Sequence, residues 1–286
     1  MATRLTVVGS ANVDLTFSVT ALPRPGETVL ASALSSTPGG KGGNQAVAAA
    51  RAGAQVQLVA ALGTDAAAEQ LKAHLLANSV GLDGVTAVPG PSGSAAILVD
   101  AAGENCIVVA PGANGHLSLS SPAVRDVVAD SDVVLLSLEI PIDTAVTAAR
   151  IGRSAGATVV LNASPASAQS SVLADLADVV VVNETESDGW LDGDRPRVPH
   201  LVITRGARGA TYVGETRSEF PAPAVEAVDT TGAGDVFAGV LAAHWPRGAV
   251  YALARACAAG ALSTLVHGAG DCAPYSEAVE DVLEAS

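Results

Sequence analysis

The sequence predicts an α/β fold, with a mainly parallel central sheet, helices on both of its faces and a second, smaller β-sheet. Short apolar runs of strand length alternate with segments of helical periodicity along most of the chain. Strands that are apolar throughout are typical of a parallel sheet that is covered on both sides. Two other stretches hold β-like segments without a helix between them, and these predict the smaller sheet.

The elements of the central sheet follow in chain order. The predicted strands are 5–9, 56–62, 132–138, 157–163, 178–183 and 201–206. The predicted helices are 44–52, 66–78, 121–128, 143–155 and 234–243. A further strand is expected at 224–228, shortly before the last of these helices. Because parallel strands need a crossover between them, this alternation indicates repeated strand–helix–strand units.

The smaller sheet is predicted from residues 12–38 and 94–110. The first stretch holds the turn-rich LPRPGE followed by TVLASALSS, and the second has the pattern of a hairpin around an Ala-Ala-Gly turn. The chain shows no tandem repeat, low-complexity linker or sustained heptad. We therefore expect one domain, 1–286, to which these strands are added.

Composition excludes several classes of function. The 286 residues are 49% hydrophobic, which is ample for a buried core, and the net charge of −14 leaves no basic surface for nucleic acid or for an anionic membrane. The longest apolar runs are strand-sized, and Asn12 and Asp14 interrupt the N-terminus before a signal-like core develops. A cytoplasmic protein is expected. The three cysteines and five histidines lack the spacing of a zinc site or disulfide framework.

Polar residues gather where the predicted strands end. Each alone is typical of a cap or a turn, but ligands of open parallel sheets bind at the carboxyl ends of the strands, so the shared placement predicts a site there. These residues are Asn12, Asp14, Glu139, Asn162, Asn183, Glu186, Thr204 and Gly206.

The stretch VDTTGAGDVF, residues 228–237, predicts a tight turn that leads into a helix. A helix beginning there would direct unpaired N–H groups and its positive dipole end at an anion, with the Asp235 carboxylate beside it. That arrangement suits proton removal from a hydroxyl that attacks a phosphoryl group. The alternative is that Asp235 only caps the helix. Phe237 stands where a dinucleotide fingerprint needs its third glycine, which argues against NAD.

A second glycine-rich turn lies in TPGGKGGNQAVAAARAG, residues 37–53. It is not a phosphate-binding loop of the Walker A type, because Gly42 follows Lys41 where Ser or Thr is required. The turn would bring backbone amides, the Lys41 ammonium and the Asn44 amide close to a small polar ligand. A flexible loop that caps a helix would explain the glycines but not the pairing of Lys41 with Asn44.

Together these stretches resemble the ribokinase-like (phosphofructokinase B) family of carbohydrate kinases. The resemblance covers nearly the whole chain through ordered motifs, namely SANVDL, GGKGGNQA, GENCIVVAPGAN, NASPAS, NETES, TRGARGA and VDTTGAGD. It implies that the smaller sheet is a lid that closes over a sugar and often forms a dimer contact. It further implies that Asp235 is the general base and that the amides of Gly232, Ala233 and Gly234 form an anion hole.

The resemblance also assigns the ligands. The sugar would be held by Asn12, Asp14, Gly40, Lys41, Asn44, Ala95, Ile97, Glu139 and Asp235. The nucleotide would be bound by Asn183, Glu186, Thr204, Gly206, Gly209, Gly234 and Cys257. Mg²⁺ would be organised by Glu186 through water, and K⁺ would be bound by Asp229, Thr231, Ser263, Val266, Gly268 and Cys272.

By this resemblance the expected activity is ATP-dependent phosphorylation of the 5-hydroxyl of D-ribose by a cytoplasmic homodimer that contacts its partner through the lid. Two alternatives are a family kinase that acts on another small sugar or a nucleoside, and a catalytically silent sugar-binding regulator. Three departures from the family pattern concern the nucleotide and cation sites: a short connection after NETES, Cys257 near the adenine, and Cys272 beside the cation.

Overall fold

A nine-stranded sheet forms the centre of the molecule. The computed structural model describes residues 2–165 and 170–285. The strands lie in the order β15-β14-β13-β10-β9-β8-β1-β4-β5. Their bounds are β1 Arg4–Val8, β4 Gln55–Leu62, β5 Val80–Ala87, β8 Val133–Ser137, β9 Thr158–Asn162, β10 Val179–Asn183, β13 His200–Thr204, β14 Ala210–Val213 and β15 Arg217–Phe220.

The sheet is parallel from β13 to β5, and only the pairs β13–β14 and β14–β15, at one edge, are antiparallel. The predicted mostly parallel sheet is thus confirmed. The sequence analysis did not identify β5, β14 or β15. β5 mixes buried and exposed residues, and β15 alternates exposed with half-buried residues, because these strands lie at the two edges, so the continuous apolar run that identifies a central strand is missing.

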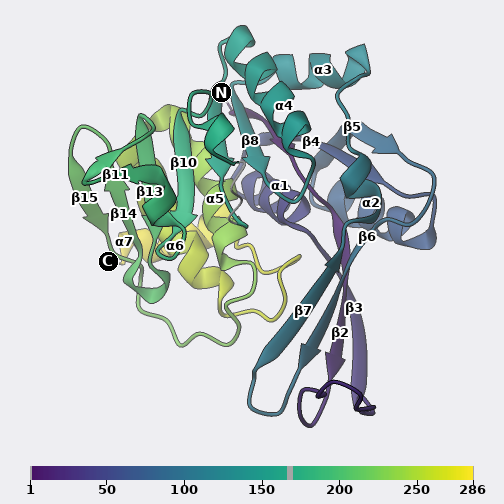
Figure 1. Cartoon of the computed structure of the whole chain (residues 1–286). Coiled ribbons are helices and arrows are strands. Elements are labelled where there is room, and N and C mark those ends of the chain that lie inside the picture. The colour runs from purple at the N-terminus through teal and green to yellow at the C-terminus, as the bar shows by residue number, and fades with distance from the viewer. Residues whose placement is uncertain (1, 166–169, 286) are drawn as a thin grey trace.

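Helices cover both faces (Figure 1). One core contains residues of α1 Lys41–Arg51, α5 Ala233–His244, α6 Ala249–Ser263 and α7 Ser276–Glu284, and α2 Ala66–Ala77 also contributes to it. The other core contains residues of α3 Pro122–Ala129 and α4 Ile142–Ala155. The strands divide their side chains between the two cores with a period of two, so that Leu135 belongs to the first and Leu136 to the second. Truncating either fully buried leucine to Ala should cost about 2–5 kcal/mol of unfolding free energy.

The connection between the parallel strands β10 and β13 contains no α-helix. It consists of the 3₁₀ turn η3 Ser187–Trp190 and a two-stranded hairpin, β11 Leu191–Asp192 and β12 Arg195–Pro196. Trp190 and Val198, each 5% exposed, cover the second core beside these strands. The other 3₁₀ turns are η1 Gly112–His116, η2 Ser170–Leu173, η4 Gly206–Arg208 and η5 Trp245–Arg247.

The smaller sheet has the strand order β3-β2-β6-β7 and projects from the body (Figure 1). Its strands are β2 Asn12–Ser18, β3 Ala33–Gly39, β6 Gly93–Val99 and β7 Asn105–Ala110. The β6–β7 hairpin turns around residues 100–104, as the sequence predicted. Buried Ala11 and Val13 pack near α2 at the base of the sheet, whereas every residue of β7 is exposed. We call this sheet the lid sheet.

Two predicted boundaries were wrong. No strand forms at 224–228. The segment runs from β15 toward α5 outside any sheet, and the Val228 amide at its end donates to the Thr264 carbonyl. Pro221 and Pro223, just before it, lack the N–H groups that a sheet edge needs. The first helix begins at Lys41 and not at residue 44. The helices α6 and α7 were not predicted, and residues 166 and 167 of the NASPAS motif lie outside the described residues. No helix among the described residues is long and apolar enough to cross a membrane.

Candidate active site

The start of α5 brings an acid and a helix N-terminus together. Gly232 is the N-cap, with a positive φ of 80°, and a Cβ at this position would lie 2.8 Å from the Cα of Ala269. Only glycine satisfies both conditions. The amides of Asp235 and Val236 donate to the Gly232 carbonyl, and no side chain caps the helix. The alternative in which Asp235 serves as the helix cap is therefore not what the structure shows.

Asp235 instead binds two amides from α1. Its Oδ2 accepts a hydrogen bond of 3.1 Å from Asn44 Nδ2, and its Oδ1 accepts one of 2.9 Å from Gln45 Nε2. The carboxylate is 7% exposed. Burial raises the pKa of Asp235, and the nearby Lys41 charge and the two amide donors oppose that rise. A carboxylate with a raised pKa accepts a proton more readily than an ordinary aspartate.

Four acids and one lysine interact across the site. Burial, with the charges of Glu139 and Asp235, raises the pKa of Asp14 to about 6. The charge of Asp235 in turn raises the pKa of Lys41, which also feels Glu139 and Glu186. Lys41 is therefore charged at neutral pH and lies among three carboxylates, which belong to α5, to the loop after β8 and to the turn after β10.

Asn12 is oriented by a residue that the sequence analysis did not single out. Asn114 donates to Asn12 Oδ1 at 2.7 Å and accepts from the Ala11 amide at 3.1 Å. Because the Asn12 oxygen is used in this way, its Nδ2 donor is the group left for a ligand. A Cβ at Gly93 would clash with both amides, so the glycine makes room for this pair.

The other predicted sugar residues also lie around the lid base. Glu139 Oε2 accepts from Ser10 Oγ at 2.5 Å and from the Lys41 amide at 3.3 Å. Gly40 has a positive φ, and a Cβ there would lie 2.7 Å from the Asn12 amide. In the lid sheet, Ala95 pairs with Asp14 and Ile97 pairs with Thr16, so both face the side on which Asp14 lies.

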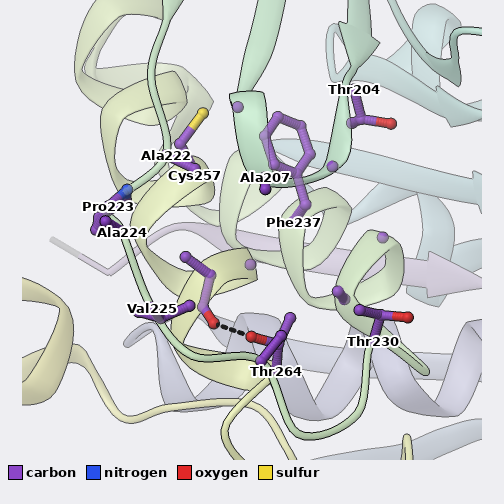
Figure 2. A pocket seen from close by; sticks show the side chains of 17 residues that line it. Thr204, Ala207, Ala222, Pro223, Ala224, Val225, Thr230, Phe237, Cys257 and Thr264 are labelled. Atoms are coloured by element: carbon purple, nitrogen blue, oxygen red, sulfur yellow. Dashed lines mark hydrogen bonds between the residues drawn. The ribbon is translucent and has the colours of Figure 1, made fainter.

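Two adjoining cavities lie at this edge of the sheet. The smaller, of about 130 Å³, is polar and includes Lys41, Asn183, Glu186, Gly232 and Asp235 in its lining. The larger, of about 530 Å³, is mostly apolar (Figure 2). Its lining includes Thr204, Gly206, Gly209, Pro223, Phe237, Cys257 and Thr264. Thr204 and Gly234 line both cavities, which therefore adjoin at the start of α5.

The larger cavity has the size and character of a site for an aromatic base and its sugar. Segment 222–225, for which the sequence analysis predicted part of a strand, forms one wall together with Cys257 (Figure 2). Burial raises the pKa of the Cys257 thiol to about 12, and its Sγ lies 3.5 Å from the Phe220 carbonyl. Cys257 is therefore an unreactive wall residue.

Asn183 and Glu186 form a reciprocal pair beside the polar cavity. Asn183 Oδ1 accepts from the Glu186 amide at 3.0 Å, and Glu186 Oε2 accepts from the Asn183 amide at 3.2 Å. Asn183 Oδ1 also accepts from Thr185 Oγ1 at 2.6 Å, so both of its lone pairs are used. Glu186 keeps further carboxylate lone pairs, and carboxylate oxygens are the ligands that Mg²⁺ and its bound waters prefer. The described residues contain no group of three or more His, Cys, Asp or Glu able to hold a metal ion unaided.

The residues expected around K⁺ also come together. Asp229 accepts from the amides of Thr231 and Gly268, at 2.8 and 2.9 Å. Cys272 Sγ lies 3.8 Å from the Thr231 carbonyl, and the Val266 amide donates to the Ser263 carbonyl. The set offers carbonyl oxygens and one carboxylate, which are hard oxygen donors, and the Cys272 thiol contributes none.

Sequence reasoning missed three residues of this network, namely Ser10, Gln45 and Asn114. All three are buried polar side chains that contact another site residue and not an open cavity. Gln45 stands inside the quoted GGKGGNQA motif and Asn114 ends GENCIVVAPGAN. Their polarity within otherwise apolar or small segments was the available signal, but only the fold shows their partners.

Comparisons with known proteins agree on one family. A model described as pfkB family carbohydrate kinase matches residues 2–275. The ribokinase of Haemophilus influenzae is 34% identical over 99% of both chains, and that of Bacillus subtilis is 35% identical over 97% of this chain and 98% of its own. The structure of Arabidopsis thaliana ribokinase complexed with ribose and ATP superposes with a TM-score of 0.88 at 30% identity, covering 100% of both chains.

Proposed function

The chain belongs to the pfkB family of carbohydrate kinases, and we propose that it transfers the γ-phosphoryl group of ATP to the 5-hydroxyl of D-ribose. One observation carries the proposal: the buried Asp235 carboxylate lies at a helix N-terminus where a polar and an apolar cavity meet. The choice of ribose and ATP is supported by the ribokinase relatives and by the Arabidopsis complex.

Asp235 is proposed as the general base. Its two oxygens are held by Asn44 and Gln45, and the carboxylate lines the polar cavity. An acceptor hydroxyl in that cavity would give its proton to Asp235 as its oxygen attacks the terminal phosphorus atom.

The start of α5 is proposed as the anion hole. The amides of Gly232, Ala233 and Gly234 belong to the first turn, where N–H groups and the helix dipole favour negative charge. A Cβ at Gly234 would meet nothing within 4 Å, so the backbone is open to a ligand at this point. The Lys41 ammonium lines the same cavity and would neutralise charge on the transferred group.

The sugar is proposed to lie between the body and the lid sheet. Asn12 offers its Nδ2 donor, Asp14 and Glu139 offer carboxylate oxygens, and Gly40 lets the backbone approach closely. Ala95 and Ile97 would contact the apolar side of the ring. A site that hydrogen-bonds individual hydroxyls discriminates strongly against analogues that lack them, because its buried polar groups are then unpaired.

ATP is proposed to place its adenosine in the apolar cavity and its phosphates along Thr204, Gly206, Gly209 and Gly234. Mg²⁺, when bound with the phosphates, would neutralise charge on their oxygens. Glu186 and Asn183 would orient its waters. K⁺ is proposed to bind Asp229, Ser263 and the carbonyls of Thr231, Val266 and Gly268, where its charge would order the neighbouring anion hole. Rates that stay equal when Na⁺ replaces K⁺ at constant ionic strength would refute the K⁺ site.

A second copy of the chain is proposed to cover the lid sheet. Leu34 and Val108 are 61% and 63% exposed on the face of the lid sheet opposite to Asp14, and exposed apolar side chains on one face favour an interaction surface. We also propose a cytoplasmic location, because ATP, the proposed donor, is supplied in that compartment.

A coupled kinase assay over a panel of acceptors tests the proposed function. With saturating ATP and Mg²⁺, kcat/KM for D-ribose should exceed the values for 2-deoxyribose, fructose and adenosine. A higher value for fructose or adenosine would reassign the substrate within the family. A folded protein without kinase activity toward any acceptor would refute the enzymatic function itself.

A further inference from the structure

Gln45 contacts the proposed base from inside the core. Its side chain is 0% exposed, and its Nε2 donates to Asp235 Oδ1 at 2.9 Å. The preceding residue, Asn44, donates to the other carboxylate oxygen. Consecutive residues of α1 therefore hold the two oxygens of one carboxylate. Gln45 lines neither of the two cavities, whereas Asp235 lines the polar one.

The amide of Gln45 is used on one side only. Its Oε1 is buried and has no hydrogen-bond partner among the described residues. An unpaired buried acceptor is unfavourable, and an apolar side chain of similar size would avoid it. The opposite amide orientation would place this oxygen against a carboxylate oxygen. The Gln45 amide is therefore oriented so that its Nε2 donates to the Asp235 carboxylate, and its Oε1 is left without a partner among the described residues.

The backbone is adapted to this contact. A Cβ at Gly239, one turn beyond Asp235 on α5, would clash with the Gln45 carbonyl and would lie 2.9 Å from the Cβ of Ala48. The missing side chain lets α1 and α5 approach closely. That approach brings the short reach of a Gln side chain within hydrogen-bond distance of Asp235.

From this geometry we propose that Gln45 is a positioning residue for the kinase reaction, which holds the Asp235 carboxylate oriented and ionised without touching sugar or nucleotide. The inference rests on the proposed function, in which Asp235 is the base. Asn44 differs from Gln45 because it is also assigned to the sugar, so only Gln45 acts on the carboxylate alone.

Other charged groups also act on Asp235. Lys41 lies at the start of α1 and favours the ionised carboxylate, whereas Glu139, after β8, disfavours it. Asp14 on β2 and Cys272 in the loop before α7 interact with the charge of Asp235 as well. The substitution Gln45→Met leaves all four groups in place and removes one N–H donor with little change in side-chain length.

The test compares Gln45→Met with wild type over pH 5 to 9. Loss of a hydrogen bond to the charged form raises the pKa of a carboxyl group, and the base works only when it is deprotonated. The acid limb of kcat/KM should therefore move upward by about one pH unit. Below the pKa of the base kcat should fall by up to about tenfold, recover at higher pH, and leave KM for ribose and ATP within about threefold.

Gln57→Met is the matched control. Gln57 Nε2 donates to the Asp83 carboxylate at 3.0 Å at the opposite end of the sheet, so the same bond type is removed far from the site. Its pH profile should be that of wild type. A folded Gln45→Met enzyme with an unchanged acid limb and unchanged kcat would overturn the inference and leave the proposed function intact.

A second variant covers the case in which Gln45→Met does not fold. Gln45→Glu keeps the size of the side chain but adds a negative charge beside Asp235 when ionised, so the acid limb should move upward further than in Gln45→Met. An unchanged acid limb in this variant would also overturn the inference. An inactive wild-type protein in the same assay would overturn the proposed function and, with it, the role of Gln45.

Discussion

At the scale of single residues, Asp235 is a first-turn acid that does not cap its helix. The variant Asp235→Asn cannot accept a proton and keeps only one of the two amide hydrogen bonds, because its own NH₂ must face a donor. We expect kcat to fall by roughly 10²- to 10⁴-fold, with a much smaller change in KM for ribose. Steady-state kinetics and a thermal melt of the same preparation measure both effects.

A first-turn acid on another helix provides the control for this variant. Asp143 is exposed in the first turn of α4. Asp143→Asn should leave kcat unchanged. Equal, small effects of the two substitutions would mean that Asp235 acts only on the helix dipole, and the general-base role would have to be abandoned.

Asp14 should make stability depend on pH. Its pKa is about 6 in the folded state, against about 4 for an unfolded aspartate. The folded state therefore binds more protons between these values, so the free energy of unfolding falls as pH rises from about 4 to about 6. Asp14→Asn removes this loss. It should be more stabilising at pH 7.5 than at pH 4.5, by on the order of 1–2 kcal/mol in urea unfolding after allowance for its partial exposure.

The pKa of Asp65 is shifted in the opposite direction to that of Asp14. Burial raises its pKa, but hydrogen bonds from Ser92 and from the Ala68 amide outweigh burial and lower the pKa below its usual value. Its contribution to stability is complete above the unfolded pKa, so Asp65→Asn should destabilise about equally at pH 4.5 and 7.5. If the change in unfolding free energy caused by Asp14→Asn is likewise the same at pH 4.5 and pH 7.5, burial does not raise the pKa of Asp14.

At the scale of elements, the close contact between α1 and α5 positions the base. Gly239→Ala would force the Gln45 carbonyl away, with an expected loss of about 1–3 kcal/mol in unfolding free energy. Because α1 also carries Asn44, we expect kcat to fall by roughly tenfold or more. Urea unfolding and steady-state kinetics at 25 °C measure the two losses.

Gly152→Ala is the control that distinguishes a loss of stability from a loss of turnover. A Cβ at Gly152 on α4 would lie 2.8 Å from Val134 Cγ2, a tight contact in the other core. This variant should lose comparable stability and keep the wild-type kcat. Were both variants to retain full turnover, the packing of α1 on α5 would not determine the position of Asp235.

The elements also show what the sequence could and could not predict. The central strands were identified because burial on both faces makes them apolar throughout, and Asp235, Lys41 and Asn44 were identified from glycine-rich turns. The start of α1 was misplaced because Gly42 and Gly43, poor helix formers, are helical here. A Cβ at Gly42 would lie 2.6 Å from the Gly9 carbonyl carbon, so tertiary packing and not local propensity selects glycine.

Partners distant along the chain were beyond the reach of sequence reasoning. The bond between Gln45 and Asp235 spans 190 positions, and that between Asn114 and Asn12 spans 102. No local pattern encodes either pairing. The segment 224–228 has the residue types of a strand, but its role as a cavity wall follows from the two prolines before it and from the position of α5.

At the scale of the whole molecule, the lid sheet should decide the oligomeric state. Val108 is 63% exposed on the edge strand β7, on the face of the lid sheet opposite to Asp14. Val108→Asp would place a charge in the proposed dimer contact, and we expect the dissociation constant to rise by tenfold or more, as for loss of a buried apolar contact. Light scattering after gel filtration, over a dilution series, measures it.

Leu76→Asp is the control because Leu76 is 60% exposed on α2, in the body of the molecule. It should leave the oligomeric state unchanged. A wild-type protein that has the mass of one chain at all concentrations would contradict the proposed dimer.

The central position of β1 has a consequence for how the chain reaches its native state. The first strand to be synthesised pairs with β4 and β8, and Arg4 bonds to Asp132, 128 positions later. The hydrogen bond between Asn44 and Asp235 joins residues that are even farther apart along the chain, by 191 positions. Such non-local pairing slows folding and exposes early segments to misassembly. On the ribosome, β1 can therefore pair with β4 early, but its other edge remains unpaired until β8 emerges about halfway through the chain, and the catalytic pair forms only near the end of translation.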